Sequence, residues 1–454
     1  MIKITKIKLN NFRFFADDEQ NNSFNLEDGK NLLLYGENGS GKSSLFKAFD
    51  FLTKTKIDED EFQNERNIFK LEEESFIEFN FNNSDTLRID GDHLELNDDY
   101  PYINKLSVFK PILDYKTLLN IHYNSNNKTS VINIYPMLKE LLNNYPITHE
   151  SAQIMSDLNN PQEYFETMKS LVTDEFFEDI KTYLTIFDNK FNIDSFDFDM
   201  QFSDDGRVEF ITTLKINYMD NELSKYHLFL NEARLTSLAI SVYFTIIKNI
   251  ATIMGEDSLK ILVLDDLLIS LDMSNRLHLV DLLKTHFTDF QIIFLTHDKA
   301  LFEIFKEKME WKPYEIYVDE NEEGVEIPYI KTSNSLLQQA INHKINKNYD
   351  CSANLLRQYC EKLLCKLLPT ENLVNKNCKT LDLNGLLQNG ISFENGKGTD
   401  KNQITIEILT ELQTFRRVLL NPASHNDDTN IFKREIEDTI NLLNDFKNEL
   451  EIIT

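Results

Sequence analysis

Residues 36–43 read GENGSGKS, which is the pattern Gly-x4-Gly-Lys-Ser of a phosphate-binding loop. The apolar run at residues 32–35 predicts a buried strand before the loop, and residues 43–51 predict a helix after it. In this order, successive backbone N–H groups converge on phosphate oxygens at the positive end of the helix. Glycines are needed because side chains would block the close approach of the backbone to a phosphate. The stretch therefore predicts an α/β P-loop NTPase fold.

The residue types within this loop predict individual roles. Lys42 is expected to reach the β- and γ-phosphates of a nucleotide, and the Ser43 hydroxyl is expected to bind Mg²⁺. ATP and Mg²⁺ are thus the expected cofactors. The other residues of the loop expected to bind the nucleotide are Gly36, Asn38, Gly39, Gly41 and Ser44.

Length and composition place the chain among ordinary globular proteins. Its 454 residues are enough for two or three domains, and 27% of them are charged. The N-terminus alternates like a strand and lacks the apolar core of a signal peptide. The longest apolar stretch, residues 237–254, contains Lys248 and is too short and polar to span a bilayer. We therefore expect a cytoplasmic protein that has no membrane segment.

The four cysteines, Cys351, Cys360, Cys365 and Cys378, lie in the last third of the chain. Their spacing fits no zinc pattern, and without a secretory signal they are expected to be buried thiols. A structural metal is not expected at these positions.

The net charge of −28 is distributed unevenly along the chain. Residues 331–454 contain 15 Lys and Arg against 16 Asp and Glu, whereas residues 1–330 contain 32 against 59. Strong acidity opposes general binding to nucleic acid, because basic side chains drive affinity for phosphates. Any nucleic acid is therefore expected to meet a local groove or the nearly neutral C-terminal third.

The hydrophobic pattern divides the chain into two parts. An ATPase domain is expected over residues 1–330, with a short helical arm at about 136–190, and a helical domain over residues 331–454. Residues 196–202 and 208–218 alternate around Asp204-Asp205-Gly206 and predict a hairpin. The expected strands are 2–15, 32–35, 76–81, 86–89, 261–264 and 291–295. The expected helices are 273–286, 335–346, 349–368, 404–420, 430–453 and a long helix from about 232, with a loop over 377–402.

A second nucleotide signal follows at residues 259–266, where an apolar strand ends in two carboxylates. Asp265 is expected to hold Mg²⁺ through water, and Asp266 to position or deprotonate the attacking water. Ser270-Leu271-Asp272 comes next, and Leu295-Thr296-His297-Asp298 ends the following strand. The order of these motifs predicts that His297 senses the γ-phosphate.

This series of motifs resembles ABC-type ATPases of the RecF, SMC and OLD kind over about residues 1–310. The resemblance implies that Arg13, in Asn11-Phe12-Arg13-Phe14, lies near the nucleotide and that Asp272 belongs to a D-loop. Residues 230–234, Leu-Asn-Glu-Ala-Arg, occupy the place of the family's Leu-Ser-Gly-Gly signature. Asn231 and Glu232 are then expected to recognise ATP bound to a second copy, because Asn231 can donate to a phosphate at the positive end of a helix.

Three departures from the family pattern concern the same site. Asn231 replaces the signature serine, and Asp266 replaces the commoner glutamate, which favours slow turnover. The family's Q-loop glutamine has no clear counterpart, although Asp114-Tyr115-Lys116 stand near the expected place. The resemblance implies a head-to-tail homodimer or a higher homo-oligomer in which ATP joins the subunits and hydrolysis releases them.

The C-terminal third resembles the HEPN superfamily of helical bundles, many of which are metal-independent ribonucleases. The resemblance lies in Arg357-x3-Glu361, followed by Arg417-x3-Asn421-x3-His425 and a final amphipathic helix. It implies that Arg417 stabilises phosphorane charge and that His425 transfers protons, with Glu361 in the same site. Seven residues separate Arg417 from His425, against four to six in the family. The alternative is that these side chains cap helices and form a surface ion pair.

Together the two parts resemble bacterial anti-phage, abortive-infection proteins such as the PrrC-like anticodon nucleases, which implies an RNA or tRNA target. One alternative is an ATP-gated scaffold that binds or restrains a separate nuclease, as in Septu systems. Another is a RecF-like DNA-repair ATPase. The acidity of residues 1–330 argues against this alternative, because it opposes binding to DNA phosphates.

Overall fold

The computed structural model describes residues 1–16, 22–70, 73–96, 100–103, 106–109, 111–114, 133–143, 145–147, 153–202, 208–219, 221–223, 231–255, 257–267, 271, 273–321, 324–332, 336–375, 379–397, 403–416 and 433–453. These residues form two compact units, Met1–Thr332 and Ser333–Thr454. The predicted boundary after residue 330 lies inside the last strand of the first unit, β13. Each unit has its own hydrophobic core.

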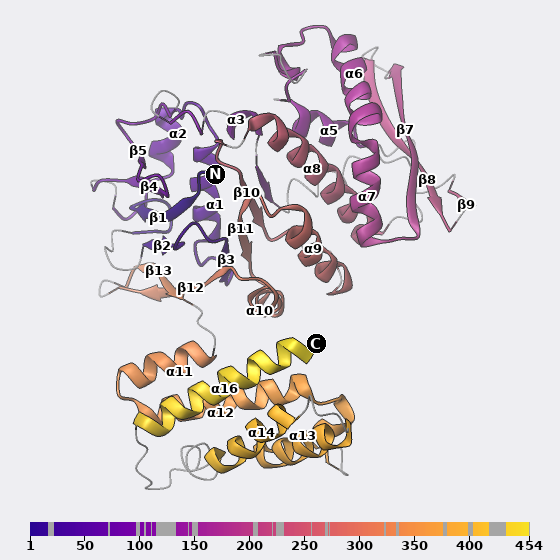
Figure 1. Ribbon diagram of the computed structural model, residues 1–454. Coiled ribbons are helices and arrows are strands. Elements are labelled where there is room, and N and C mark those ends of the chain that lie inside the picture. Colours follow the sequence, from indigo (N-terminus) through magenta and orange to yellow (C-terminus); the bar gives the residue numbers. More distant parts are fainter. Residues whose placement is uncertain are drawn as a thin grey trace. The chain divides into compact units, whose positions relative to one another are not determined.

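A six-stranded mixed sheet forms the centre of the first unit as far as the structure describes it (Figure 1). The strands from β12 to β6 are mutually parallel, and only β13 runs antiparallel to its neighbour. Every residue of β11 is buried, as expected for a parallel strand covered on both faces. In spatial order the strands are β13 (Glu326–Thr332), β12 (Lys312–Glu320), β3 (Leu32–Gly36), β11 (Gln291–Thr296), β10 (Ile261–Asp265) and β6 (Ile112–Asp114).

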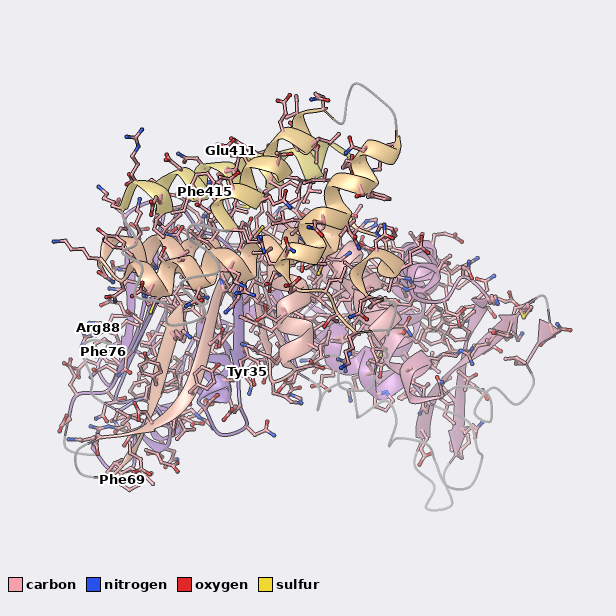
Figure 2. All side chains as sticks on the ribbon, turned by 90° about the horizontal axis from the view of Figure 1, so that it is seen from below. Tyr35, Phe69, Phe76, Arg88, Glu411 and Phe415 are labelled. Atoms are coloured by element: carbon pink, nitrogen blue, oxygen red, sulfur yellow. The ribbon has the colours of Figure 1, made fainter. Side chains whose placement is uncertain are left out.

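A second, antiparallel sheet of four described strands carries the N-terminus. The Arg88 guanidinium lies over the ring of Phe76, 3.8 Å from its centroid (Figure 2). The predicted first strand, 2–15, is too long, because Asn11 and Arg13 have positive φ angles of 50° and turn the chain. The strands are β2 (Ser23–Asn25), β1 (Ile4–Asn10), β4 (Phe76–Phe81) and β5 (Thr86–Asp90).

Helices pack around these sheets. The long helix α8 begins at Glu232, as predicted, and ends at Met254. Its segment Ala233–Ile253 is long and apolar enough to cross a membrane. However, 78% of the apolar stretch in this segment is buried inside the fold, as in the core helix of a globular protein. The other helices that flank the two sheets are α1 (Lys42–Leu52), α2 (Glu59–Asn64), α3 (Leu106–Phe109), α9 (Met273–His286) and α10 (Lys299–Lys308).

The arm combines helices with the predicted hairpin. Strands β7 (Phe191–Phe202) and β8 (Val208–Tyr218) pair antiparallel, and β9 (Asn221–Glu222) pairs with β8. The hairpin lies beside α6 and α7 (Figure 1). The helical segments of the arm are α5 (Tyr135–Leu142), the 3-10 turn η1 (Met155–Asp157), α6 (Pro161–Ser170), the π-helical turn η2 (Leu171–Phe176) and α7 (Phe177–Phe187).

The second unit is helical over its described residues. The apolar positions predicted for the last helix, among them Ile436, Leu443 and Phe446, are buried in its core. The elements are α11 (Leu336–Ile345), α12 (Tyr349–Leu367), the 3-10 turn η4 (Thr370–Leu373), α13 (Leu383–Lys397), α14 (Gln403–Phe415) and α16 (Lys433–Ile453).

The loop predicted for residues 377–402 is wrong over most of its length, because α13 occupies Leu383–Lys397. Leu383, Leu386 and Leu387 recur at helical spacing and are buried. A Cβ at Gly390 would lie 3.3 Å from Leu409 of α14 and 3.4 Å from Leu364 of α12. Close packing therefore accounts for this glycine within a helix.

The prediction that the cysteines are buried is also wrong in part. Cys360 is buried, but Cys351 and Cys365 are exposed on α12, and Cys378 lies outside the described residues. No group of three or more potential metal ligands occurs among the residues that the structure describes.

Candidate nucleotide site

The phosphate loop connects the end of β3 to the start of α1. Gly39 and Gly41 have φ angles of 86° and 106°, which side chains rarely tolerate. A Cβ at Gly36 would lie 2.4 Å from the Ser40 Oγ, so this position also requires glycine. Just before the loop, Tyr35 packs against Phe302, with 5.7 Å between ring centroids. The sequence pattern and the backbone therefore agree on a cradle for phosphate.

Lys42 is held within this loop. Its side chain is buried, and its Nζ donates hydrogen bonds to the carbonyl oxygens of Gly36 (2.6 Å) and Glu37 (3.0 Å). Burial lowers the pKa of Lys42, whereas the charges of Asp266 and Asp265 act in the opposite direction. The ammonium thus lies in the field of both predicted acidic residues, where it can exchange two carbonyl partners for phosphate oxygens.

The hydroxyls after Lys42 differ in exposure. Ser43 is exposed on the first turn of α1, whereas Ser44 is buried and its Oγ accepts a hydrogen bond from the Phe14 N–H (3.4 Å). Asn38 is exposed at the tip of the loop. Ser43 is therefore available to a metal ion, and Ser44 anchors the helix to the turn that contains Arg13.

Three acidic residues, Asp114, Asp265 and Asp266, lie at one edge of the mixed sheet. The parallel register places Asp265, the last residue of β10, beside Asp114, the last residue of β6. Burial and the neighbouring Asp266 raise the pKa of Asp265 to about 7, although Lys42 opposes the shift. The Asp265 Oδ1 is buried and has no hydrogen-bond partner among the residues that the structure describes. A buried acceptor in that condition fits a divalent cation, for which the exposed Ser43 hydroxyl is the other predicted ligand.

Asp266 and His297 form a pair at the ends of neighbouring strands. The Asp266 Oδ1 accepts a hydrogen bond from the His297 N–H (2.8 Å) and lies 2.7 Å from the His297 Nδ1. Asp266 has a φ of 48°, and its own N–H donates to the Leu295 carbonyl. A strained backbone at a strand end is frequent in functional sites. With Nδ1 engaged, Nε2 is the imidazole nitrogen available to a phosphate.

Asn231 stands at the N-cap of α8, as the motif order predicted. Its Oδ1 accepts a hydrogen bond from the Arg234 N–H (3.0 Å), and the residue is exposed. Arg234 in turn contacts the arm, because its Nε lies 3.3 Å from the Asp188 Oδ2 and its guanidinium lies over the ring of Tyr218. The start of α8 is therefore tied to the ends of α7 and β8.

Two further residues of the site were missed by the sequence analysis. Arg276 forms an ion pair with Asp298, next to His297, and its Nε donates to the Leu271 carbonyl (2.8 Å). It thereby connects α9 to Leu271, which follows Asp266 in the chain, and to Asp298, which follows His297. Arg234 was not assigned a role either. Only their positions in the sequence could have indicated a role for these two residues. Arg234 is three residues after Asn231, and Arg276 is five residues after Leu271.

Arg13 forms an ion pair within its own unit, and its place near the nucleotide stays a prediction. The Arg13 Nη1 forms an ion pair with the Glu65 Oε2 (2.7 Å), and its N–H donates to the Glu65 carbonyl. Its loop reaches α1 through Phe14. The predicted site residues that lie outside the described part of the chain are Asp272, Arg417, His425 and the side chain of Glu232.

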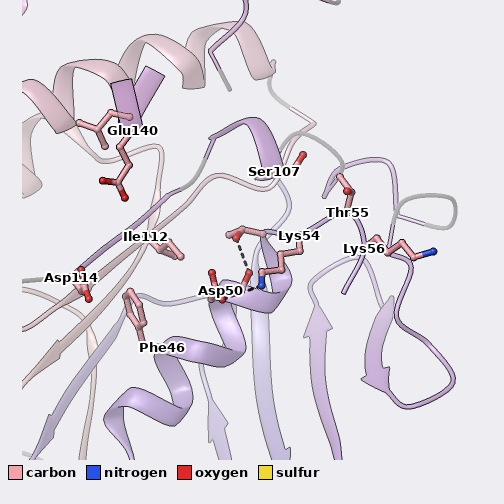
Figure 3. A pocket seen from close by; sticks show the side chains of 11 residues that line it. Phe46, Asp50, Lys54, Thr55, Lys56, Ser107, Ile112, Asp114 and Glu140 are labelled. Atoms are coloured by element: carbon pink, nitrogen blue, oxygen red, sulfur yellow. Dashed lines mark hydrogen bonds and ion pairs between the residues drawn. The ribbon is translucent and has the colours of Figure 1, made fainter. Parts of the chain in front are cut away.

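A cavity of about 500 Å³ adjoins Asp114 between α1, β6 and α5 (Figure 3). Lys54 and Asp50 on its wall form an ion pair (3.6 Å), and Lys54 also contacts Glu61 (2.6 Å). Lys56, another wall residue, contacts Glu95 (2.5 Å). The basic groups on this wall are thus already matched by carboxylates.

In the C-terminal unit, Arg357 and Glu361 contact each other, with 3.1 Å between Nε and Oε1. The two residues lie one helical turn apart on α12. This geometry suits both readings of the pair, as a surface ion pair and as part of a catalytic group.

Replacing Asp265 by asparagine is expected to stabilise the ligand-free protein at about pH 8 by about 1–3 kcal/mol. The folded-state pKa of about 7 lies above the reference value of 3.8. Ionisation of Asp265 therefore destabilises the folded state progressively as the pH rises between these values. The gain in Asp265→Asn should be largest above pH 7 and small near pH 4. Urea unfolding across this range measures it.

The matched control for this experiment is Asp281→Asn, which changes an exposed carboxylate on α9. It should leave the pH profile of the wild type unchanged. A gain in Asp265→Asn that is the same at every pH would contradict the assignment.

The fold that these observations define is an ABC-type P-loop NTPase with a mixed sheet, followed by a helical C-terminal unit. Residues 20–158, which include the phosphate loop, match the family model described as ABC transporter. That match supports ATP binding and hydrolysis by the first unit. No curated protein matches the sequence of the chain.

The solved structures to which the chain is similar include SMC head domains. An SMC head bound to the C-terminal winged-helix domain of ScpA is 11% identical, with 74% of this chain and 99% of that chain covered and a TM-score of 0.43. The Pyrococcus furiosus head with an extended coiled coil, bound to the C-terminal domain of ScpA, is 13% identical (75% and 98% covered, TM-score 0.38). The Thermotoga maritima head domain is 13% identical (73% and 99% covered, TM-score 0.38).

Proposed function

We propose that this chain hydrolyses ATP at the edge of its mixed sheet and uses the nucleotide to join two copies of itself. The observation that carries the proposal is the convergence of the phosphate loop after β3, the carboxylates after β10 and His297 after β11. Because these strands are parallel neighbours, their carboxyl ends lie at one edge. A triphosphate in the loop would point its γ-phosphate toward the acidic residues.

Each side chain then has a defined task. Lys42 offers positive charge to the β- and γ-phosphates, and Asp266 orients or deprotonates the attacking water. His297 reports the γ-phosphate through Nε2 while Asp266 holds its Nδ1. Mg²⁺, held by Ser43 and through water by Asp265, would neutralise phosphate charge.

A second copy would contact the bound nucleotide through its Asn231. This residue is exposed at the positive end of a 23-residue helix, where a phosphate from a neighbouring subunit can be recognised. The contact of Arg234 with the arm would make assembly depend on the arm as well.

We further propose that assembly controls an RNA-directed activity of the C-terminal unit in a cytoplasmic anti-phage system. The near neutrality of residues 331–454 supports this, because the first 330 residues are too acidic to attract a polyanion. The Arg357–Glu361 pair on α12 is the described part of the proposed site. Its predicted catalytic members are Arg417 and His425.

Incubation with tRNA, mRNA and plasmid DNA, each with and without ATP, tests this activity. His425→Ala is expected to lower RNA cleavage by about 100-fold or more, because it removes the proton-transfer group. His343→Ala, a histidine of α11 in the same unit, is the control and should cleave as the wild type does.

Other outcomes separate the alternatives. Cleavage that His425→Ala retains would refute the nuclease assignment. No cleavage by the wild type, together with ATP-dependent assembly, would favour the scaffold for a separate nuclease. Preference for DNA would favour the repair ATPase.

A further inference from the structure

Arg276 makes two polar contacts from the N-terminal part of α9. Its Nε donates a hydrogen bond to the Leu271 carbonyl (2.8 Å), and its Nη1 forms an ion pair with the Asp298 Oδ2. The Arg276 side chain is only 15% exposed. A guanidinium that is largely removed from water and bound by two acceptors is held in one orientation, and it holds both acceptors in turn.

Asp298, the acceptor in the ion pair, is also fixed by its own backbone contacts. Its Oδ1 accepts a hydrogen bond from the Leu301 N–H (3.0 Å) at the start of α10, and its N–H donates to the Thr296 Oγ1 (3.1 Å). Burial acts to raise the pKa of Asp298, but the Leu301 N–H and Arg276 lower it overall. Asp298 is therefore an anion that binds the start of α10 with one oxygen and Arg276 with the other.

Both contacts of Arg276 are made with segments that follow the proposed catalytic residues. Asp298 follows His297 directly in the chain, and Leu271 is five residues after Asp266. Asp266 and His297 are themselves joined, because the Asp266 Oδ1 accepts the His297 N–H (2.8 Å). Arg276 thus closes a ring of contacts that contains both catalytic residues.

The conformation of Asp266 needs support from its surroundings. Its φ of 48° is unfavourable for a residue that has a Cβ, and such a conformation persists only where neighbouring contacts impose it. Asp266, His297, Asp298 and Arg276 all line a cavity of about 120 Å³. Because this space is open, close packing alone does not fix the side chains around it, and their polar contacts carry more of that task.

We propose that Arg276 is a positioning residue for ATP hydrolysis, which fixes the segments after Asp266 and His297 and so keeps both side chains in the arrangement that the reaction needs. The inference rests on the proposed ATPase function. Arg276 contacts segments that follow β10 and β11, whereas the phosphate loop follows β3. Its loss should therefore slow hydrolysis and leave the binding of ATP intact.

Arg276→Gln tests this role in two measurements, phosphate release and equilibrium binding of labelled ATP. At saturating ATP and Mg²⁺ its kcat is expected to be about 10-fold or more below that of the wild type, because small displacements of catalytic groups are costly. The Kd of ATP is expected to change by less than about threefold. Arg276→Lys keeps a charge for Asp298 but lacks the rigid fork that reaches two acceptors, so its kcat should lie between the two.

A second comparison separates positioning from a general loss of structure. Adding Arg276→Gln to Asp266→Asn should lower kcat by less than about twofold further, because the effects of residues that act as one unit are not additive. A variant that merely loses structure would lose activity in both backgrounds. The matched control is Arg88→Gln on β5, which removes an arginine bound by Glu74 and Asp90 and should hydrolyse ATP as the wild type does.

The outcomes distinguish this inference from the proposed function. A wild type without hydrolysis, or hydrolysis that Lys42→Ala retains in full, would overturn the proposed function and the inference with it. Where Lys42→Ala lowers hydrolysis, a wild-type kcat in Arg276→Gln would overturn the inference alone. So would an equal loss from Arg276→Gln in the wild-type and Asp266→Asn backgrounds, or a loss of ATP binding as large as the loss of kcat. Thermal unfolding verifies the folding of each variant, and Arg276→Lys takes the place of Arg276→Gln in all comparisons if the latter does not fold.

Discussion

Lys42→Ala is expected to lower the rate of ATP hydrolysis by about 10²–10³-fold, the usual effect of removing one preorganised charge from a reacting phosphate. The Lys42 ammonium is already held against the carbonyls of Gly36 and Glu37. Its positive charge is therefore available to the phosphates of ATP without a rearrangement of the loop backbone. Phosphate release at saturating ATP and Mg²⁺ measures the effect.

Lys47→Ala is the matched control on the same helix. The Lys47 Nζ lies 2.8 Å from the Asp50 Oδ2 and 2.9 Å from the Glu61 Oε1, in an ion-pair network away from the loop. This variant should hydrolyse ATP within a few-fold of the wild type. A Lys42→Ala protein as active as the Lys47→Ala protein would show that the loop is not the catalytic site.

Asp266→Asn is expected to lower hydrolysis by about 10²–10⁴-fold while ATP stays bound. Asparagine keeps an oxygen that can accept the His297 N–H, but it cannot take a proton from water. Equilibrium binding of labelled ATP, measured beside hydrolysis, separates the two effects. Asp281→Asn on α9 serves as the control. Loss of ATP binding in Asp266→Asn would assign a structural role to this residue.

Much of the first unit could be predicted because local pattern and tertiary position agree there. The apolar runs of β3, β10 and β11 are buried parallel strands. Such strands are covered on both faces, so a continuous apolar run is enough to predict them. The helix at Met273–His286 was predicted with its observed bounds. The N-terminal turn at Asn11 and Arg13 was missed, because left-handed backbone at non-glycine residues has no clear signal in one sequence.

The helix α13 was missed because its glycines read as helix breakers. Their local preference is overruled by packing, since Gly390 lets α13 approach Leu409 and Leu364. Such an approach depends on two other helices and is not encoded in the neighbouring residues. The prediction of a loop therefore failed because the sequence pattern does not show these contacts between helices.

The candidate site was predictable to the level of residues but not of atoms. The motif order brings Asp265, Asp266 and His297 to the ends of neighbouring strands, as the structure has them. The contact between the Asp266 Oδ1 and the His297 Nδ1, and the raised pKa of Asp265, depend on burial and side-chain direction. The pairing of Arg13 with Glu65 depends on a turn that the pattern did not predict. The roles of Arg417 and His425 stay predictions.

The most direct test of the account is the mass of the Asp266→Asn protein in sedimentation equilibrium with saturating ATP and Mg²⁺. If ATP joins two copies through Asn231, the mass is twice that of one chain, and it falls to that of a single chain when Asn231→Asp is added. The aspartate retains the helix cap, whereas Asn231→Ala would lose about 1 kcal/mol of stability. Asn231→Asp therefore keeps the start of α8 intact while it replaces the amide donor opposite the phosphate with a negative charge. A single-chain mass with ATP bound, or a dimer unaffected by Asn231→Asp, would contradict the account.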